Sequence, residues 1–272
     1  MINDKKIKIE SILKKEPIIN RDNAYVFIEH KKILEISAGN SLKGYIQSYC
    51  KKWGDLYSQL VLILGPVISS IRFKKLQKTL LAKYTKDSIV LSIGSGPHVY
   101  MGRNDIINCD LFEFPNVDIV CEVSSLPIKD NSVDYIINVA MLEHVKNPNI
   151  IIQQMLRVSK KDGIVLCWVP FIQPFHAAPE DYFRWTKNGA KELFKDFSSV
   201  DVGIGAGPTS GMLWIVQEWL SLVLSFGNSA LKDIIFLILM VLTFPVKYLD
   251  IIFERYPNAD KLASGFYIYA KK

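Results

Sequence analysis

From residue 88 to the end of the chain, short apolar runs alternate with turn residues and amphipathic segments. Seven runs rich in Val and Ile predict β-strands at residues 88–93, 105–109, 117–121, 133–139, 163–169, 200–204 and 265–270. Helical spacing of apolar residues predicts helices over 149–159, behind Pro148, and over 186–197, where Thr186 is a natural N-cap. Strands that alternate with helices are typical of a parallel α/β sheet.

Two of the predicted connections are too short for a crossover helix. Eight residues separate Gly96 from Asp105, and seven separate Cys109 from Val117. A βα crossover needs about a dozen residues. We therefore expect the first two crossovers to be a single turn or an irregular loop.

The segment before the first strand, residues 41–87, combines apolar residues at helical spacing with many lysines. The spacing predicts helices that break at Gly65-Pro66. Its second half carries five lysines: Lys74, Lys75, Lys78, Lys83 and Lys86. They indicate either a solvated helix face or a surface that attracts anionic lipid or phosphate.

A strongly apolar insertion, residues 211–248, separates the sixth predicted strand from the last. Its second run, residues 234–246, has 13 residues without charge. A helix of that length spans roughly 20 Å, against about 30 Å of bilayer hydrocarbon, so an ordinary transmembrane helix is disfavoured. Three interpretations remain: a helical hairpin that dips into one leaflet, a lid over the active site, or burial against the N-terminal helices.

Composition is that of a folded globular protein, because 49% of the 272 residues are apolar. The net charge of +6 is unevenly distributed. Residues 1–88 carry 17 basic and 8 acidic groups, residues 89–210 carry 10 and 14, and residues 211–272 carry 6 and 5. No concentrated basic stripe is visible, so nucleic acid is not an expected partner.

The four cysteines lie far apart and form no C-x-x-C pair, which indicates neither a zinc ribbon nor a disulfide framework. The N-terminal residues lack the apolar stretch and cleavage site of a signal peptide. We expect a cytoplasmic protein. The basic first third and the apolar insertion together suggest peripheral contact with the anionic inner face of the membrane.

The first predicted strand runs into a glycine loop, Gly94-Ser95-Gly96, where a ligand can approach the backbone closely. A dinucleotide fingerprint would need Gly at the position of Val99, which argues against NAD. Asp110 follows the second strand, where a carboxylate can accept both hydroxyls of a ribose. Glu122 and the N–H of Val123, after the third strand, could bind an adenine. A simple turn and surface carboxylates are the alternatives.

Three stretches read in order resemble a known family. They are LSIGSG (91–96), NCDLFEFPNVDIVCEVSSLPIKDNSVDYIINVAMLEHVKNP (108–148) and MLRVSKKDGIVLCWVPF (155–171). The set is similar to a class I S-adenosylmethionine-dependent methyltransferase of the methyltransferase type 11 kind. The resemblance implies a Rossmann-like seven-strand sheet, mostly parallel with an antiparallel last strand, over residues 88–272. It also implies S-adenosylmethionine as the cofactor.

The resemblance assigns cofactor contacts to the ends of the first four strands. The glycine loop would face the methionine end, Asp110 the ribose and Glu122 the adenine, and Asn138 would lie under the cofactor. The residues assigned to cofactor binding are Ile93, Gly94, Ser95, Gly96, Asp110, Leu111, Glu122, Val123 and Asn138.

Two residues depart from the family pattern. Ser92 stands where an acidic residue usually orders the cofactor's ammonium end, and His98 stands where a third glycine is usual. We therefore expect a weaker or differently anchored cofactor. Residues 1–40 also faintly resemble the end of a zinc-ribbon domain that precedes some such enzymes, but its cysteines are absent, so no metal is expected.

Methyl transfer from a sulfonium is an in-line displacement, so it needs alignment and no metal or covalent residue. A hydroxyl acceptor would benefit from a base, and histidine has a suitable pKa. His176 is the preferred base because it follows the fifth strand, on the edge of the sheet where ligands of such folds bind. His144 is the second candidate.

The segment around His176, PFIQPFHAAPEDYFRWT, resembles a pattern in a subset of these methyltransferases. Asp181, Tyr182 and Arg184 are its candidate substrate or loop residues. In the structural alternative, His176 and Asp181 order the loop, Arg184 pairs with Asp181 three residues away, and Tyr182 packs.

The sequence thus predicts a methyltransferase that acts on a small or lipid-linked acceptor. It leaves open whether oxygen, nitrogen or carbon is methylated, with O-methylation as one option. A non-catalytic scaffold of the same fold is the first alternative, motivated by Ser92 and the short crossovers. A nicotinamide oxidoreductase and a nucleic-acid methyltransferase are less favoured.

Overall fold

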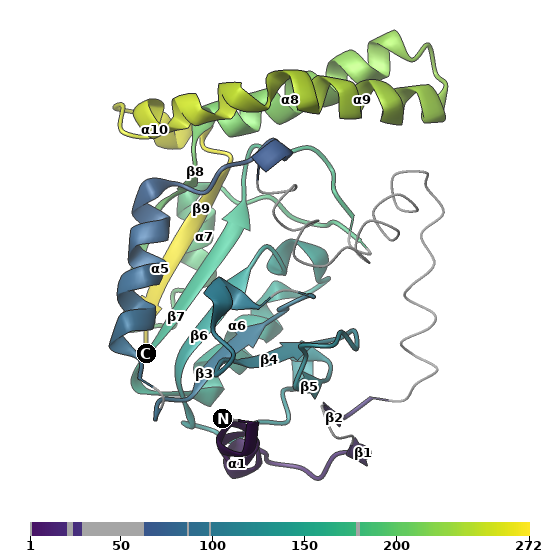
Figure 1. Ribbon diagram of the computed structural model, residues 1–272. Helices are drawn as coiled ribbons and strands as arrows, with labels where there is room; N and C mark the ends of the chain where they lie inside the picture. The colour runs from purple at the N-terminus through teal and green to yellow at the C-terminus, as the bar shows by residue number, and fades with distance from the viewer. Residues whose placement is uncertain (1, 21–23, 29–62, 86, 98, 178–179) are drawn as a thin grey trace.

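The computed structural model describes residues 2–20, 24–28, 63–85, 87–97, 99–177 and 180–272. A twisted sheet runs through the molecule in the order β1-β2-β5-β4-β3-β6-β7-β9-β8 (Figure 1). Its strands are β1 (Ile19–Asn20), β2 (Tyr25–Val26), β3 (Val90–Ile93), β4 (Ile107–Asp110), β5 (Ile119–Val120), β6 (Val133–Val139), β7 (Ser159–Pro170), β8 (Ser199–Ala206) and β9 (Gly265–Lys271). The helices expected over residues 41–62, and Cys50, lie outside the described residues.

Strands β3 to β9 are the seven predicted from the sequence. Strands β5, β4, β3, β6 and β7 pair in parallel, and β9 is antiparallel to both β7 and β8. The mixed sheet of the expected fold is therefore confirmed. Because β8 and β7 run in the same direction, the carboxyl ends of six strands face one edge of the sheet.

The sheet differs from the expectation in having nine strands among the described residues. A short antiparallel ladder, β1–β2, adds to its edge, and β2 pairs in parallel with β5. The ladder covers backbone groups of β5 that would otherwise form an open edge. Ala24, Val26 and Ile28 also pack there on Val117 and Val120. Strands of two residues carry too little pattern to be predicted from the sequence.

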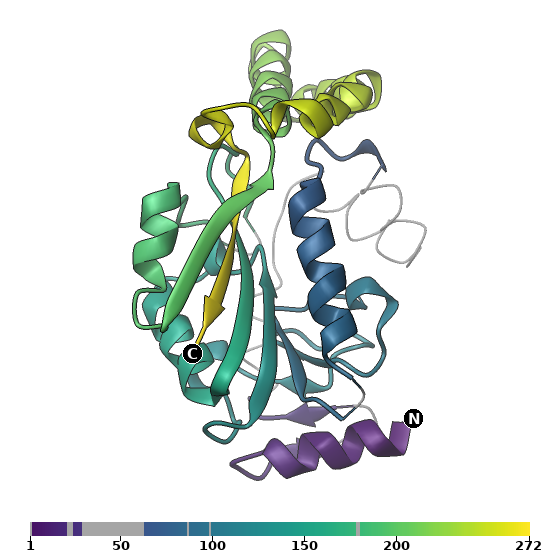
Figure 2. The ribbon, with the colours of Figure 1, turned by 90° about the vertical axis from the view of Figure 1, so that its left-hand side faces the viewer.

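The first two crossovers are as short as predicted. The connection from β3 to β4 holds only a single 3₁₀ turn, η2 (Tyr100–Gly102), and that from β4 to β5 is irregular. Helix α5 (Ile71–Lys83), which precedes β3 in the chain, covers this face instead (Figure 2). Arg103 fixes its end by donating to the carbonyls of Leu81 (2.9 Å) and Tyr84 (3.3 Å).

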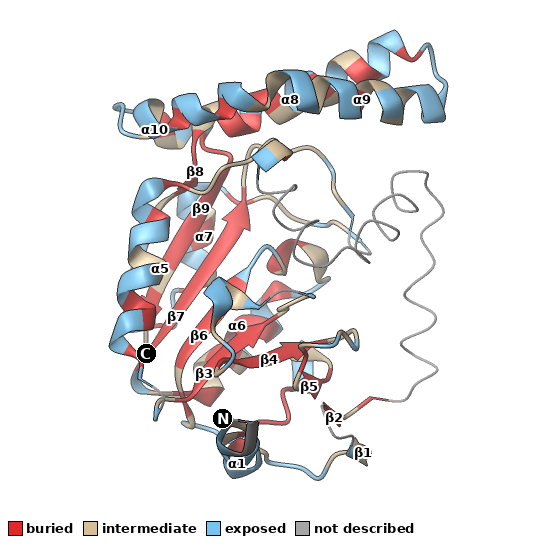
Figure 3. Ribbon diagram, viewed as in Figure 1, coloured by how far each residue is buried: buried red, intermediate tan, exposed pale blue. Residues whose placement is uncertain are grey.

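The opposite face is covered by α6 (Pro148–Val158) and α7 (Lys187–Leu193), while α1 (Ile2–Ile12) packs below the sheet (Figure 2). Residues of β6 alternate between the two cores, since Tyr135 and Ile137 face α5 whereas Ile136 faces the other side. The sheet is consequently buried on both faces (Figure 3).

A helical layer lies over the carboxyl edge of the sheet (Figures 1 and 2). It comprises α8 (Pro208–Leu224), α9 (Ser229–Thr243), η5 (Phe244–Leu249), α10 (Asp250–Phe253) and η6 (Ala259–Leu262). The buried Asp250 carboxylate accepts from the N–H groups of Thr209 (2.7 Å) and Ser210 (2.9 Å), which fixes the start of α8.

This layer is longer than the insertion expected over 211–248, because helical structure begins at Pro208 and continues past Pro245. Of the described residues, one helical segment, Ser229–Phe253, has the length (25 residues) and apolar composition needed to cross a membrane. The 13-residue run considered in the sequence is only part of it. About half of the residues of α8 and α9 are exposed, and few are buried (Figure 3).

Candidate active site

The glycine loop after β3 is constrained by a close neighbour. Gly94 has a φ of +68°, and a Cβ there would lie 2.5 Å from Cγ of Met141. Gly96 also has a positive φ, +59°. Only glycine adopts these conformations without strain, so the loop exposes its backbone next to the end of β3.

Asp110, at the end of β4, holds this loop. Its Oδ2 accepts from the N–H of Gly96 (2.8 Å), and its Oδ1 accepts from the N–H of Phe112 (2.9 Å). Burial raises the pKa of Asp110, while hydrogen bonds from the N–H groups of Phe112, Gly96 and Leu111 oppose that rise. Each carboxylate oxygen keeps a second lone pair, which a ribose hydroxyl can use.

The other residues assigned to the adenosine follow the neighbouring strand end. Strands β3, β4 and β5 are adjacent, so the loops that contain Gly96, Asp110 and Glu122 lie side by side on the carboxyl edge. Glu122 precedes the 3₁₀ turn η3 (Val123–Ser125), and both Glu122 and Val123 are partly exposed. Gly96, Asp110 and Glu122 thus form a row, which can bind a ligand that extends across three strand ends.

Asn138 has a different environment from the one expected. Its side chain is fully buried, with Nδ2 donating to the carbonyl of Ile93 (2.9 Å) and Oδ1 accepting from Sγ of Cys167 (3.2 Å). The amide therefore joins the ends of β3, β6 and β7. Its hydrogen bonds are used within the sheet.

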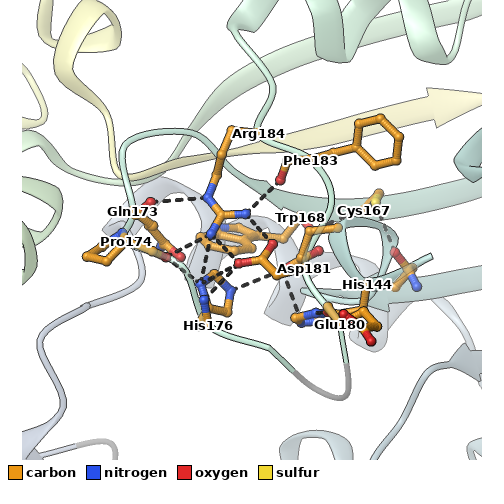
Figure 4. A network of polar contacts seen from close by, with 12 residues as sticks. His144, Cys167, Trp168, Gln173, Pro174, His176, Glu180, Asp181, Phe183 and Arg184 are labelled. Carbon is orange, nitrogen blue, oxygen red and sulfur yellow. Dashed lines mark hydrogen bonds and ion pairs between the residues drawn. The ribbon is translucent and has the colours of Figure 1, made fainter. Parts of the chain in front are cut away.

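A second group of polar residues gathers beyond β6 and β7 (Figure 4). Glu143 and His144 lie in the 3₁₀ turn η4 (Leu142–His144), and His176 lies in the loop after β7. The Nε2 atoms of His144 and His176 lie 3.8 and 3.7 Å from Oε1 of Glu143. The two imidazoles meet edge to face, with their centroids 5.5 Å apart.

The His176 loop is organised by Arg184 (Figure 4). Arg184 and Asp181 form a bidentate pair, with Nη1 to Oδ1 at 2.5 Å and Nη2 to Oδ2 at 2.6 Å. Burial is the largest single influence on Asp181 and raises its pKa, but the hydrogen bonds from Arg184 and from the N–H of His176, together with the charge of Arg184, outweigh it and lower the pKa to about 2. Asp181 also accepts from the N–H of His176 (2.7 Å), which ties the base candidate to this pair.

Tyr182 contributes mainly through its backbone, because its N–H donates to the carbonyl of Glu143 (2.7 Å) while its side chain is 41% exposed. This bond connects the loop to the turn that carries His144.

Two residues of this site were missed in the sequence. Glu143 was not among the predicted site residues, although its carboxylate lies close to both histidines. Trp214, on α8, has its ring centroid 5.2 Å from that of His176. The only local signal was the Glu-His pair after a strand, and nothing in the sequence links Trp214 to a loop some 40 residues earlier.

The comparisons agree with this geometry. Residues 104–167 match the model of a family described as methyltransferase domain. Among curated proteins, none matches the chain.

Several solved structures are similar at low identity. One is a SAM-dependent methyltransferase of Thermotoga maritima (12% identity, 81% of this chain, 97% of that chain, TM-score 0.47). Another is a SAM-dependent methyltransferase of Archaeoglobus fulgidus (15%, 74%, 94%, TM-score 0.44). A third is the phosphoethanolamine N-methyltransferase 2 of Haemonchus contortus (14%, TM-score 0.43); 72% of this chain covers about half of that protein, 52%.

The strand order and the antiparallel β9 are those of the fold that the sequence predicted. The family match adds a methyltransferase domain over residues 104–167, which lies within this sheet.

Arg184→Lys tests the organisation of the His176 loop. Lysine cannot reproduce the bidentate contact with Asp181, so we expect the free energy of unfolding to fall by about 2 kcal/mol. Chemical denaturation measures this change, and limited proteolysis should detect earlier cleavage within residues 173–186.

Lys195→Ala is the matched control. Lys195 pairs with Glu192 where both side chains are mostly exposed, so its loss should change the stability by no more than about 0.5 kcal/mol. Equal effects of the two substitutions would contradict the role given to Arg184.

Proposed function

We propose that the protein transfers a methyl group from S-adenosylmethionine to a hydroxyl of a small or lipid-linked acceptor. The observation that carries this proposal is the histidine pair around the buried Glu143, which lies on the same sheet edge as the row formed by Gly96, Asp110 and Glu122. A cofactor row beside proton-accepting groups suits transfer to an acceptor that must lose a proton.

In this proposal the cofactor extends along the three strand ends. The backbone of residues 93–96 binds its methionine part, Asp110 accepts from the ribose, and Glu122 with the N–H of Val123 binds the adenine beside Leu111. Asn138 acts from beneath by holding the end of β3 in place. The cofactor supplies an electrophilic methyl group, and the chain supplies alignment.

The histidine pair takes up the proton of the acceptor in this scheme. The side chains of His176 and His144 are 23% and 12% exposed, so an acceptor can reach them. Asp181 and Arg184 hold the His176 loop, and they act as positioning residues.

An apolar groove supports a lipid-linked acceptor. It has a volume of about 640 Å³ and is lined by Ile172, α8 and the residues around η6. Met212, Leu213 and Val216 of α8 line it, and Trp214 of the same helix contacts His176. The groove could hold the hydrocarbon part of an acceptor whose polar end lies near the histidines.

We propose further that the α8–α9 hairpin rests on the anionic inner face of a membrane. Its exposed apolar side chains outside the groove include Ile215, Trp219, Leu222, Val223, Phe226, Ile234, Ile238, Val241 and Leu242. Such an area exceeds what isolated apolar residues explain. Lys232 and Glu218 neutralise each other across the hairpin at 2.7 Å.

Cations lie near the base of this hairpin. Helix α5 begins there, since the N–H of Ile71 donates to Glu254, which follows α10, at 3.2 Å. Arg72, Lys74 and Lys75 are exposed on its first turns. Positive charge beside an apolar surface favours an anionic leaflet.

Asp110→Asn tests the cofactor part of the proposal. The amide has one acceptor oxygen where the carboxylate has two, and a hydrogen bond to a charged group is worth about 1.5–3 kcal/mol, so binding of S-adenosylhomocysteine should weaken by about tenfold or more. Calorimetry measures the affinity. Transfer of label from methyl-labelled cofactor to a cell extract should fall in parallel.

Asp162→Asn, at an exposed pair with Lys271, is the control and should change neither readout. The chemical nature of the labelled product tests the hydroxyl acceptor. A methyl ether keeps its label in mild alkali, whereas a methyl ester loses it as methanol. Label that is lost in alkali, or label on nitrogen, would contradict O-methylation of a hydroxyl.

Trp219→Glu combined with Leu242→Glu tests the membrane surface. Insertion of each apolar side chain into the membrane contributes about 1.5–3 kcal/mol to the free energy of binding. Its replacement should therefore weaken binding to phosphatidylglycerol vesicles by at least about tenfold. Vesicle cosedimentation is the measurement.

Ile7→Glu is the control, because Ile7 is equally exposed but lies on α1, at the other end of the molecule (Figure 1). A detergent-free, monodisperse wild-type protein that ignores anionic vesicles would refute the membrane proposal.

A further inference from the structure

The carboxylate of Glu143 stands out because it is completely buried without a partner. Its side chain is 0% exposed, and neither Oε1 nor Oε2 accepts a hydrogen bond from any described residue. Burying a carboxylate in this way is costly unless a cation or a donor compensates it. Across the site, the Nε2 atoms of His144 and His176 lie 3.8 and 3.7 Å from its Oε1.

Both histidines direct their Nε2 atom toward that carboxylate. Nδ1 of His144 lies 2.6 Å from the carbonyl oxygen of Glu180, and Nδ1 of His176 lies 2.9 Å from the carbonyl oxygen of Pro174. A carbonyl only accepts, so each Nδ1 carries the hydrogen. In a neutral imidazole the Nε2 atom then holds a lone pair.

Arg184 does not change this assignment, although its Nη2 lies 3.1 Å from Nδ1 of His176. Its two Nη2 hydrogens go to the closer oxygens of Pro174 (2.7 Å) and Asp181 (2.6 Å). The remaining N–H groups donate to Asp181, Phe183 and Gln173. All five donors of the guanidinium are therefore used, and Nδ1 of His176 remains a donor to Pro174.

Two imidazole lone pairs and a buried carboxylate thus face one point, where they repel each other unless a cation lies between them. We propose that Glu143, His144 and His176 bind a divalent first-row transition metal ion, for which Zn²⁺ is the probe. Their ligand atoms all lie within 4.8 Å of one another. Two histidines and one glutamate are a known ligand set of zinc sites that keep an open position.

The surroundings are those of metal-binding histidines. Such histidines almost always donate their second ring N–H to a carbonyl or carboxylate, as both do here. Asp181 is not needed as a ligand, because Arg184 neutralises it. Zn–N and Zn–O bonds of about 2.0–2.1 Å place tetrahedral ligands roughly 3.4 Å apart, so the two separations from Oε1 of Glu143, 3.7 and 3.8 Å, need contract by only a few tenths of an ångström. The two histidine nitrogens lie within 4.8 Å of each other and must also approach on binding.

Three protein ligands leave a coordination position for an oxygen ligand. If the proposed O-methyl transfer is correct, that position takes the acceptor hydroxyl, and this use of the ion rests on the proposed function. A metal-bound hydroxyl has a lowered pKa and releases its proton to water. The oxygen then bonds to the methyl carbon, and the electron pair of the broken carbon–sulfur bond stays on sulfur. No histidine base is required in the ion-loaded protein.

The test is a titration of the full chain, stripped with a chelator, with Zn²⁺ by calorimetry and with Co²⁺ by visible absorption. We expect one equivalent to bind, and we expect Co²⁺ to show the intense bands of a four- or five-coordinate site. Glu143→Gln and His176→Gln should each weaken binding by about 100-fold or more, since loss of an outer partner alone costs 10–100-fold. Glu192→Gln, which removes an exposed carboxylate on α7 that pairs with Lys195, is the control.

Binding of S-adenosylhomocysteine, measured independently of metal binding, shows whether each variant is folded with an intact cofactor site. Retained cofactor binding together with lost metal binding supports the metal site. A wild-type protein that binds neither ion specifically, or variants with unchanged metal affinity, would overturn it. Specific metal binding by a protein that transfers no methyl group to a hydroxyl would refute the proposed function and leave the metal site standing.

Discussion

The buried amide of Asn138 connects the two halves of the active site. It bonds to Ile93, directly before the glycine loop, and to Cys167 in β7, while its own strand leads into the turn of Glu143 and His144. The positions of the cofactor loop and of the histidines therefore depend on one set of hydrogen bonds with no exposure to water. Such a fully satisfied buried network fixes geometry, because any shift would leave a polar group unpaired.

The helical layer presents two different faces. Inward, α8 brings Trp214 to His176 and lines the apolar groove, whereas outward α8 and α9 expose apolar side chains. A surface that rests on lipid beside the catalytic edge would place an acceptor close to the cofactor without its passage through water. This arrangement explains why the most apolar part of the chain is inserted just before the last strand.

Local patterns in the sequence predicted the seven strands and the short crossovers, because each depends on neighbours in the chain. The β1–β2 ladder was not predictable, since it depends on pairing with β5 and not on its own pattern. Glu143 and His176 lie 33 positions apart, and only the folded loop held by Arg184 brings them together. The helical layer extends beyond the predicted insertion, because helical structure continues through Pro245 to residue 249.

The central claim is that the carboxyl edge of this sheet binds the methyl donor across three strand ends. The most direct measurement is a calorimetric titration of the full chain with S-adenosylhomocysteine and, separately, with NAD. The account predicts one equivalent of saturable binding for S-adenosylhomocysteine and no heat of binding for NAD. Binding of NAD, or no response to S-adenosylhomocysteine by the folded protein, would contradict it.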